Sequence, residues 1–493
     1  MSAPVRRSRI LSALAASSCL AVAAAGAAPP ASPKPAAPAG SAATTGFRVP
    51  APARTVLKNG LTVLVLERRT IPLVQFRLMV KAGSASDPAG REGTAALVAR
   101  LLKRGTKTRP AGQYFEEVEF VGGAIDTAAG PDASYVWGEF ATRDMEVGFN
   151  LLSDLVQNPA FRPEDFEKEK RLALADIVDA LDDPARVAQK AFAAWLYGPH
   201  PYGRPVDGTE RSVQTISRDN AVSFYGSRYV PNNAVLAIVG DVDAPQAARN
   251  ADRYFSAWKR RNVTAPVIAE AVPVRGRKVL LVDKPDATQS QIRFGNIGIR
   301  RADPDYFPLV VGNTVLGGGF TSWLVNEVRV KRGLTYSISS RVETLRSSGS
   351  FYVSTFSKNA SVLETIQVAL DQVRRLRGGD LPPEDLDKAR SFLAGLYPLR
   401  IESPEDLAAE ILSVDLYGLE PDYINQYQKR VRSAGADAVK RVAARRLPMD
   451  DLAIVVVGPA QAIGKDLETL GPVTVRSVES ALEGGGAAPA AGR

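Results

Sequence analysis

Few residues in this chain of 493 could bind a transition metal or act as strong nucleophiles. His200 is the only histidine and Cys19 the only cysteine. A hydrolytic zinc site built on one helix can use two histidines at i and i+4, which share one helical face, and a glutamate as general base. One histidine cannot supply that pair. The sequence therefore predicts no zinc site of this kind, and we interpret His200 as an ordered loop residue in the segment GPHPYGRP.

Cys19 lies in an N-terminal targeting segment. Three arginines among residues 6–9 precede an apolar stretch that ends in small residues near Ala28, a pattern typical of secretory signal peptides. We expect residues 1–28 to be removed and the mature protein, without cysteine, to be exported to the periplasm. Lipoprotein processing at Cys19, with attachment to the membrane, is the alternative. No other apolar stretch is long enough to span a bilayer.

The remaining composition indicates a soluble globular protein, with 45% hydrophobic and 23% charged residues. The formal net charge is +9, but basic and acidic residues alternate along the chain, so we expect no nucleic-acid partner. Residues 29–50 form a Pro/Ala-rich linker, and we expect residues 476–493 to be a disordered tail.

An internal duplication organises the chain between these ends. Residues 162–198 resemble residues 382–418, and matching prolines and tyrosines keep a constant offset of 220 positions. Apolar strands ending at Gly240 and Gly458 then close both copies. We predict two homologous halves at 51–265 and 275–475.

Each half has the same order of elements. Alternating strands come first, followed by a helix, a hairpin, several long helices with 3.6-residue periodicity and a final strand. This order predicts α+β halves, each with a mainly antiparallel sheet covered by helices on one face.

Several segments in this order resemble the pitrilysin/insulinase family of zinc peptidases, in particular the processing-peptidase-like group. They include LKNGLTVLV, KAGSASDPAGREGTAALVARLLKRGT, VGGAIDTAAGPDASY, VPNNAVLAIVGDVD and GGGFTSWLVNEVRVKRGLTYSIS. The resemblance covers nearly all of residues 53–475. It implies two halves that enclose a chamber and bind extended peptides.

The resemblance also shows what is missing. Family peptidases carry H-x-x-E-H on the helix that follows a Gly-x-Ala start, and a glutamate on a later helix completes the metal site. Here Ala96 and Arg100 stand at the histidine positions, Ala99 at the base position and Asp176 at the third ligand position. We expect no metal or other cofactor in this chain. We interpret Arg100 as a residue that fills the former metal position and pairs with Asp176.

The same helix keeps its packing residues. Its remaining apolar positions are predicted to hold the fold, and they are Leu97, Val98, Leu101 and Leu102.

The second half retains another family feature, Arg329 followed by Tyr336 in the frame RVKRGLTY. In the family this pair reaches the substrate, holds the scissile carbonyl and stabilises the oxyanion, as suits an arginine and a phenol. The alternative interpretation makes Arg329 a surface helix residue and Tyr336 a core residue of a strand.

A peptide-binding edge is implied near Gly122, Gly123 and Asp126, where the family adds substrate as an extra strand. Asp126 replaces the family's asparagine and would favour basic peptides. The alternative is an ordinary solvated hairpin residue.

These features predict a non-catalytic subunit that lacks peptidase activity alone. It would supply Arg329 and Tyr336 to a catalytic homologue that carries the zinc motif, in the degradation of peptide substrates. A peptide-binding or structural envelope protein is the alternative from another class. A zinc peptidase with an unorthodox site is disfavoured by the single histidine.

Overall fold

The computed structural model describes residues 48–264, here called the N-terminal half, and residues 267–482, called the C-terminal half. The expected signal peptide and most of the expected linker lie outside the described residues. Within the described part of the chain, each helix is too short or too polar to cross a membrane.

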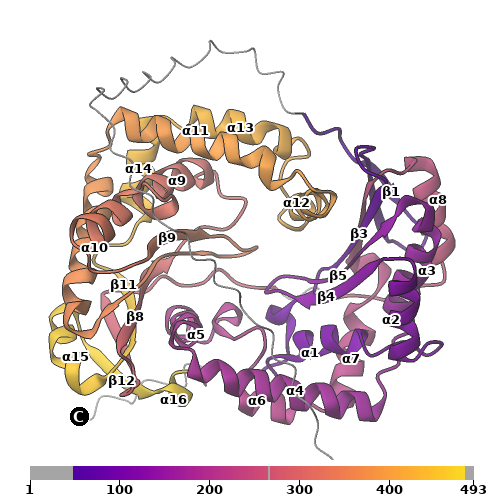
Figure 1. The fold of residues 1–493 in the computed structure, drawn as a ribbon, viewed down its shortest axis with the longest axis horizontal. Coiled ribbons are helices and arrows are strands. Elements are labelled where there is room, and N and C mark those ends of the chain that lie inside the picture. The colour runs from indigo at the N-terminus through magenta and orange to yellow at the C-terminus, as the bar shows by residue number, and fades with distance from the viewer. Residues whose placement is uncertain (1–47, 265–266, 483–493) are drawn as a thin grey trace, which may run out of the picture. The chain divides into compact units, whose positions relative to one another are not determined.

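The N-terminal half begins with three strands, continues through a helix pair and a hairpin, and ends in helices around one further strand (Figure 1). Its strands are β1 (Ala53–Val56), β2 (Thr62–Glu67), β3 (Leu73–Val80), β4 (Ala124–Ala129), β5 (Ser134–Ala141) and β6 (Ala234–Gly240). Its α-helices are α1 (Thr94–Leu102), α2 (Ala111–Phe120), α3 (Met145–Gln157), α4 (Pro163–Asp182), α5 (Pro184–Tyr197), α6 (Glu210–Thr215), α7 (Arg218–Arg228) and α8 (Ala244–Phe255).

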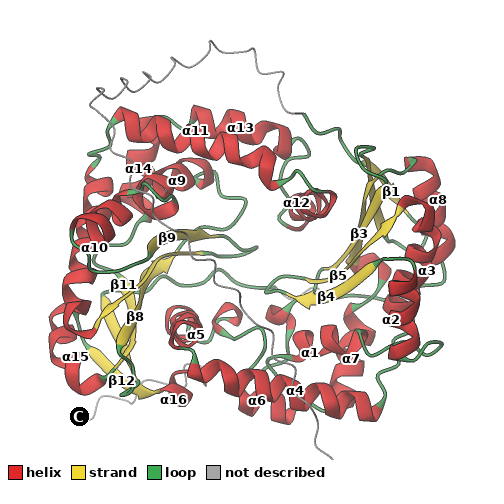
Figure 2. Cartoon of the chain, in the orientation of Figure 1, coloured by secondary structure: helices red, strands yellow, loops and turns green. Residues whose placement is uncertain are grey.

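The C-terminal half has a similar order, but it begins with two strands, ends with an additional strand and helix, and contains two π-helical segments, Thr314–Gly318 and Val325–Lys331. Figure 2 shows the helices and strands of both halves. The strands of the C-terminal half are β7 (Arg277–Asp283), β8 (Gln289–Ile297), β9 (Ile338–Glu343), β10 (Ser350–Lys358), β11 (Leu452–Gly458) and β12 (Val473–Ser477). Its α-helices are α9 (Tyr306–Asn313), α10 (Val362–Gly378), α11 (Pro383–Arg400), α12 (Pro404–Leu416), α13 (Tyr423–Ser433), α14 (Ala436–Arg446), α15 (Ala460–Leu467) and α16 (Val478–Leu482).

Each half contains one mixed six-stranded sheet. The strand orders are β1-β2-β6-β3-β5-β4 and β12-β7-β11-β8-β10-β9. In the first sheet only β2 and β6 pair in parallel, and in the second β7 pairs in parallel with both β11 and β12. The predicted α+β architecture with mainly antiparallel sheets is therefore confirmed.

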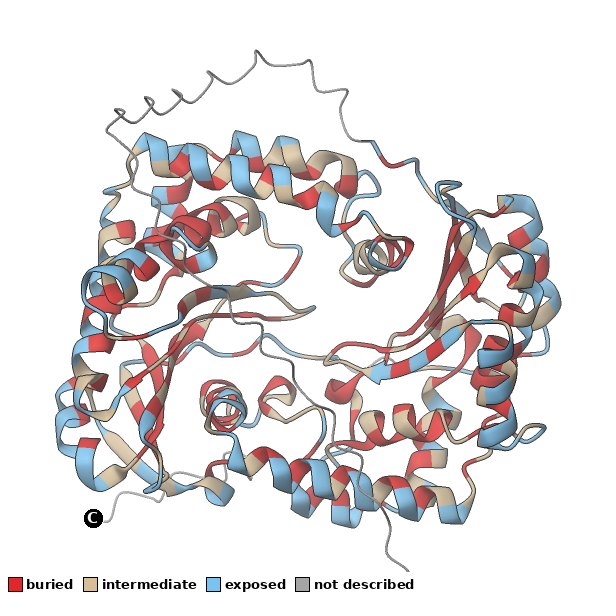
Figure 3. Ribbon diagram, in the orientation of Figure 1, coloured by how far each residue is buried: buried red, intermediate tan, exposed pale blue. Residues whose placement is uncertain are grey.

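The strands β6 and β11 lie inside their sheets and are buried along their whole length (Figure 3). Their sequences, AVLAIVG and LAIVVVG, are continuous apolar runs because both faces of these strands are covered. Edge strands differ: β4 alternates exposed and buried residues and pairs only with β5.

The cover on the second face comes from the opposite half. Helix α5 of the N-terminal half packs on β8 and β11, where Val187 and Phe192 share a core cluster with Val455. Helix α12 of the C-terminal half packs in the same way on β3 and β6 of the first sheet (Figure 1). The sequence places helices on only one face of each sheet. The structure corrects this, because the two halves exchange one helix each.

Polar contacts support this exchange. Arg77 Nη1 on β3 lies 3.4 Å from Glu405 Oε1 on α12. At another contact, Tyr202 Oη donates to Asp132 Oδ1 at 2.6 Å, and the backbone N–H of Arg346 donates to Asp132 Oδ2 at 2.9 Å. Burial raises the pKa of Asp132 above its ordinary value. The two halves thus share both apolar and polar contacts.

The prediction of a disordered tail at residues 476–493 is wrong for residues 476–482. Residues 476–482 complete β12 and form α16, where Ala481 and Leu482 are buried. They pack in the cluster that contains α5, so long-range apolar contacts order a segment whose own sequence predicts little structure. Residues 483–493 lie outside the described chain.

Candidate functional site

The helix α1 begins at a backbone turn that only glycine fits well. Gly93 precedes it with φ of 97°, and a Cβ there would lie 2.6 Å from the carbonyl oxygen of Asp207. The buried carboxyl of Asp87 accepts hydrogen bonds from the N–H groups of Gly93 and Ala95, both at 2.8 Å. Burial raises the pKa of Asp87 to about 7, against the opposing effect of these two hydrogen bonds. Asp87 therefore fixes the start of α1.

The apolar face of α1 packs into the core as predicted. Leu97, Val98, Leu101 and Leu102 are buried, which confirms their packing role. Ala99, at the position of the catalytic base in the resembling peptidases, is buried as well. A longer acidic side chain at this position is absent, so α1 carries no group there that could take a proton from water.

Arg100 and Asp176 form an ion pair between α1 and α4, with Arg100 Nη2 2.6 Å from Asp176 Oδ2. This confirms the predicted pairing. A second ion pair, Arg104–Glu169, joins the turn that follows α1 to a position two turns back along α4. The side chain of Glu169 is only 5% exposed, whereas that of Asp176 is 59% exposed. The two pairs join the helices in an antiparallel arrangement.

These positions do not suit zinc. Alanine offers no donor atom, the guanidinium of Arg100 is a fixed cation, and Asp176 is committed to that cation. Across residues 48–264 and 267–482, no three His, Cys, Asp or Glu side chains come together as a metal site. We therefore derive no chemical step of this chain through a metal.

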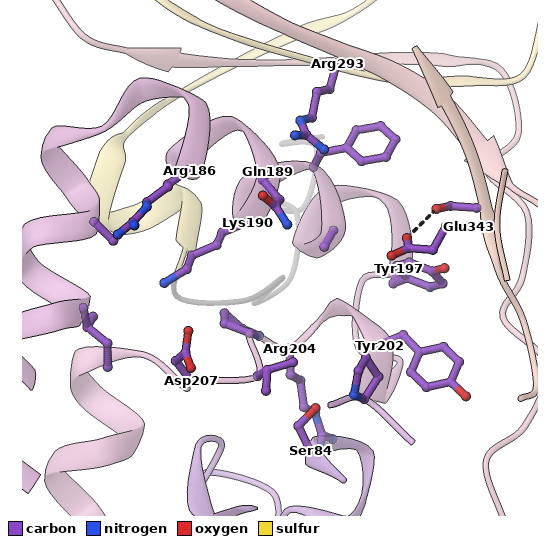
Figure 4. Close-up of a pocket in the computed structure, with 18 of the residues that line it drawn as sticks. Ser84, Arg186, Gln189, Lys190, Tyr197, Tyr202, Arg204, Asp207, Arg293 and Glu343 are labelled. Atoms are coloured by element: carbon purple, nitrogen blue, oxygen red, sulfur yellow. Dashed lines mark hydrogen bonds between the residues drawn. The ribbon is translucent and has the colours of Figure 1, made fainter. Parts of the chain in front are cut away.

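A cavity of about 670 Å³ opens beside Arg100 and Asp176. Its walls come from α1, α4 and α5 of the N-terminal half and from β8, β9 and β10 of the C-terminal half. Figure 4 shows Arg186 and Lys190 projecting from α5 and Arg293 projecting from the neighbouring sheet into the same space. Glu343 and Asp207 add acidic groups to the lining. This mixture of charges suits a polypeptide better than a ligand of a single charge sign.

Of the residues predicted to bind peptide, Asp126 lies on the edge strand β4, and Gly122 and Gly123 lie in the segment that leads into it. Gly122 has φ of 64°, and a Cβ on Gly123 would lie 2.5 Å from the ring of Phe140, so the backbone path into β4 itself requires this glycine pair. Lys103 Nζ lies 2.7 Å from Asp126 Oδ1. The carboxylate of Asp126 therefore has a basic partner from α1, which weakens the expectation that it selects basic peptides.

Arg329 and Tyr336 lie together in the C-terminal half. The guanidinium carbon of Arg329 is 4.6 Å from the ring centroid of Tyr336 and 5.2 Å from that of Phe320. Tyr336 is 74% exposed, so it is not a core residue of a strand. Among the described residues, none forms a hydrogen bond or an ion pair with the Arg329 guanidinium. The pair does not line the cavity beside Arg100.

His200 has a local role. Its Nδ1 accepts the N–H of Tyr202 at 3.1 Å, and its Nε2 lies 2.9 Å from the carbonyl oxygen of Ala269. Both ring nitrogens are therefore engaged, as expected for an ordered loop histidine.

Sequence reasoning missed three residues of the site: Arg104, Glu169 and Phe320. The spacing of Glu169 and Asp176 by seven residues would have placed both on one face of α4, whereas Arg104 lies in the turn after α1. No spacing in the sequence indicates Phe320, because its contact with Arg329 depends on the irregular path of the chain into the π-helix Val325–Lys331.

The fold and this site define a two-sheet, peptidase-type protein whose metal-binding helix lacks its ligands. Two family models match the chain in succession. The model described as "Insulinase (Peptidase family M16)" matches residues 62–210, and the one described as "Peptidase M16 inactive domain" matches residues 215–393. The chain belongs to this insulinase-like M16 family.

Relatives and solved structures agree with this assignment. An uncharacterized zinc protease of Mycobacterium leprae is 29% identical over 71% of this chain and 79% of its own length. An uncharacterized zinc protease of Rickettsia bellii is 26% identical over 83% of this chain and 98% of its own length. The crystal structure of a peptidase M16 inactive domain from Pseudomonas fluorescens has a TM-score of 0.78 at 25% identity and covers 84% of this chain and 98% of its own.

Proposed function

We propose that this protein is the non-catalytic subunit of a heterodimeric insulinase-type peptidase that degrades peptides. The catalytic partner would be a homologue with an intact H-x-x-E-H motif and its zinc ion. This chain would contribute substrate binding, together with Arg329 and Tyr336, which would hold the scissile carbonyl and stabilise the oxyanion. Export to the periplasm, or attachment to the membrane through Cys19, is part of the same proposal.

One contrast supports this proposal most directly. At the positions of the metal site, Arg100 and Asp176 satisfy each other at 2.6 Å. The guanidinium of Arg329, in contrast, has only aromatic neighbours among the described residues and lies beside the exposed Tyr336. A cation and a phenol that form no hydrogen bond within the described chain are available to an oxygen atom of a bound peptide.

Reconstitution tests the proposal. We expect the purified chain alone to leave a quenched fluorescent peptide uncleaved, and to gain chelator-sensitive activity when mixed with the H-x-x-E-H homologue encoded in the same genome. Chelator-sensitive cleavage by the chain alone would contradict the proposal.

Two variants test the proposed role of the pair. Arg329→Ala should lower kcat/KM of the reconstituted pair by about 100-fold or more, as expected for the loss of an oxyanion-stabilising donor, and Tyr336→Phe should also lower it. Arg374→Ala is the matched control, because Arg374 is an exposed arginine of the same half that pairs with Asp371. If both site variants were as active as this control, Arg329 and Tyr336 would have no catalytic role.

The second candidate function is a peptide-binding or structural envelope protein without peptidase activity. The free edge of β4 favours it, because strand addition uses only backbone hydrogen bonds and needs no metal. Binding of unstructured peptides by the chain, with no activity beside any M16 homologue of the same genome, would support this function over the first.

A further inference from the structure

A second pocket lies in the C-terminal half, next to Phe320. Its volume is about 250 Å³, and it is formed by the π-helix Thr314–Gly318, the following loop and one face of α11. The apolar side chains of its lining are Val315, Phe320, Trp323, Ala389 and Phe392. A pocket of this volume is large enough for one bulky apolar side chain.

Aromatic residues at this pocket are exposed to an unusual degree. Phe320 is 77% exposed and Phe392 is 48% exposed, while Trp323 is buried. Exposed aromatic side chains that gather at a concave site are typical of binding surfaces, because covering them removes apolar area from water. The indole N–H of Trp323 already donates to Asp385 Oδ2 at 2.9 Å, and the guanidinium carbon of Arg375 lies 4.0 Å from the centroid of this ring, so Trp323 offers the pocket apolar ring surface and no free donor.

The pocket also contains an unsatisfied polar group. Ser322 is 3% exposed, and its Oγ has no hydrogen-bond partner among the described residues. A buried hydroxyl without a partner costs free energy unless a ligand or a water molecule satisfies it. Ser322 lines the pocket, so a backbone N–H or carbonyl group of a bound ligand could form a hydrogen bond with its hydroxyl.

A guanidinium group that forms no ion pair within the described chain lies next to a residue of the pocket. Arg329 stacks on Phe320, which lines the pocket, and the nearby acidic residue Glu327 is paired with Lys331. Arg329 therefore complements an oxygen acceptor, such as a peptide carbonyl or a carboxylate. Phe320 therefore connects the apolar pocket, which also contains the hydroxyl of Ser322, to the guanidinium of Arg329.

We propose that this pocket binds a large apolar side chain, such as phenylalanine or leucine, of an extended peptide whose neighbouring carbonyl or carboxylate lies against Arg329. Binding is a property of this chain alone. A further role of the pocket, in which it sets the preference for an apolar residue beside the scissile bond, rests on the proposed function.

Photo-crosslinking of the chain alone tests the site. The probe is a short unstructured peptide of glycine, serine and asparagine with one benzoylphenylalanine. We expect the crosslink to map to the π-helix and loop at residues 314–323 or to α11, and to be suppressed by a peptide with phenylalanine in the same position. Crosslinks confined to other segments, or no suppression, would overturn the proposal.

Fluorescence anisotropy with the same peptide series supplies the matched comparison. The wild-type chain should bind the phenylalanine peptide about 10-fold or more tighter than its alanine analogue, as expected for an apolar side chain in a fitted pocket. Phe320→Ala and Phe392→Ala should each reduce this ratio, and Ala389→Phe should reduce it by filling the pocket. Phe120→Ala is the control, since Phe120 is 90% exposed on α2 of the other half.

The partner subunit is the other possible occupant of this surface. If Phe320→Ala and Phe392→Ala released the catalytic homologue in gel filtration while the ratio between the two peptides stayed unchanged, the pocket would be a subunit contact and the proposal would fail. Preferential binding without any active partner would leave the pocket proposal standing and end the proposed function. If the reconstituted pair were active but kept its preference for phenylalanine after both substitutions, the proposed function would stand and the pocket proposal would fail.

Discussion

Arg100 Nη2 lies 2.6 Å from Asp176 Oδ2, across two helices whose equivalent positions hold a metal ion in the resembling peptidases. In the turn that follows α1, Arg104 pairs with Glu169. Two guanidinium groups thus join α1 and its C-terminal turn to α4 by direct charge contacts. The helix frame persists because its apolar face and its glycine start are intact, although its chemistry has changed.

The two ion pairs should differ in their contribution to stability. Arg104→Ala leaves the buried carboxylate of Glu169 without its cation, so we expect the free energy of unfolding to fall by about 3 kcal/mol or more. Arg100→Ala leaves the exposed Asp176, which water can solvate, so the expected loss is below about 1 kcal/mol. Urea denaturation of both variants measures the difference. Equal losses would contradict it.

Restoring the ligands should restore metal binding. The variant Ala96→His, Ala99→Glu, Arg100→His and Asp176→Glu places two imidazoles at i and i+4 on α1 and a longer carboxylate on α4. We expect about one zinc ion per chain by elemental analysis after gel filtration, against none for the natural chain. The variant with only Ala99→Glu and Asp176→Glu is the control. A folded variant without zinc would mean that α1 and α4 no longer have the spacing of a metal site.

Asp87 should make stability depend on pH. Its pKa is raised from an ordinary value of 3.8 to about 7, mainly by burial, while Glu92 raises it further and Arg204 lowers it. An acid with a higher pKa in the folded state holds its proton more tightly there. The free energy of unfolding should therefore fall as pH rises from about 4 to about 7, by up to about 4 kcal/mol.

Asp87→Asn removes the ionisation and should flatten this pH dependence, as measured by urea denaturation at several pH values in the interval. Ser217→Ala is the control. It removes a cap of α7 whose Oγ accepts the N–H of Asn220 at 3.2 Å, and neither side chain ionises in this range, so it should shift stability equally at every pH. A pH dependence that persists in Asp87→Asn would assign it to other groups.

The exchanged helices should make the two halves interdependent. Without the C-terminal half, the apolar face of α5 with Val187, Phe192 and Leu196 would be exposed to water. We expect the fragment 48–264 alone to aggregate and the fragments 48–264 and 267–482 to co-purify when expressed together. A soluble, cooperatively unfolding N-terminal fragment would contradict this expectation.

The sequence alone showed which zinc-dependent chemistry this chain cannot carry out, and it predicted the class of the fold. One histidine excludes a zinc site with two histidines, and alanine at positions 96 and 99 leaves no donor and no base on α1. The repeat and the periodicity of the apolar residues predicted two α+β halves, because burial imposes a local pattern on strands and helices. The packing residues of α1 followed from the same pattern.

Only the tertiary structure decided how these parts meet. The exchange of α5 and α12, the ordering of residues 476–482 and the stacking of Phe320 on Arg329 join segments far apart or separated by irregular backbone. Likewise, the partner of Asp126 is Lys103, on another element. A local pattern shows which face of an element is buried, but not against which element. That choice depends on the packing of the whole chain, which no short segment of the sequence encodes.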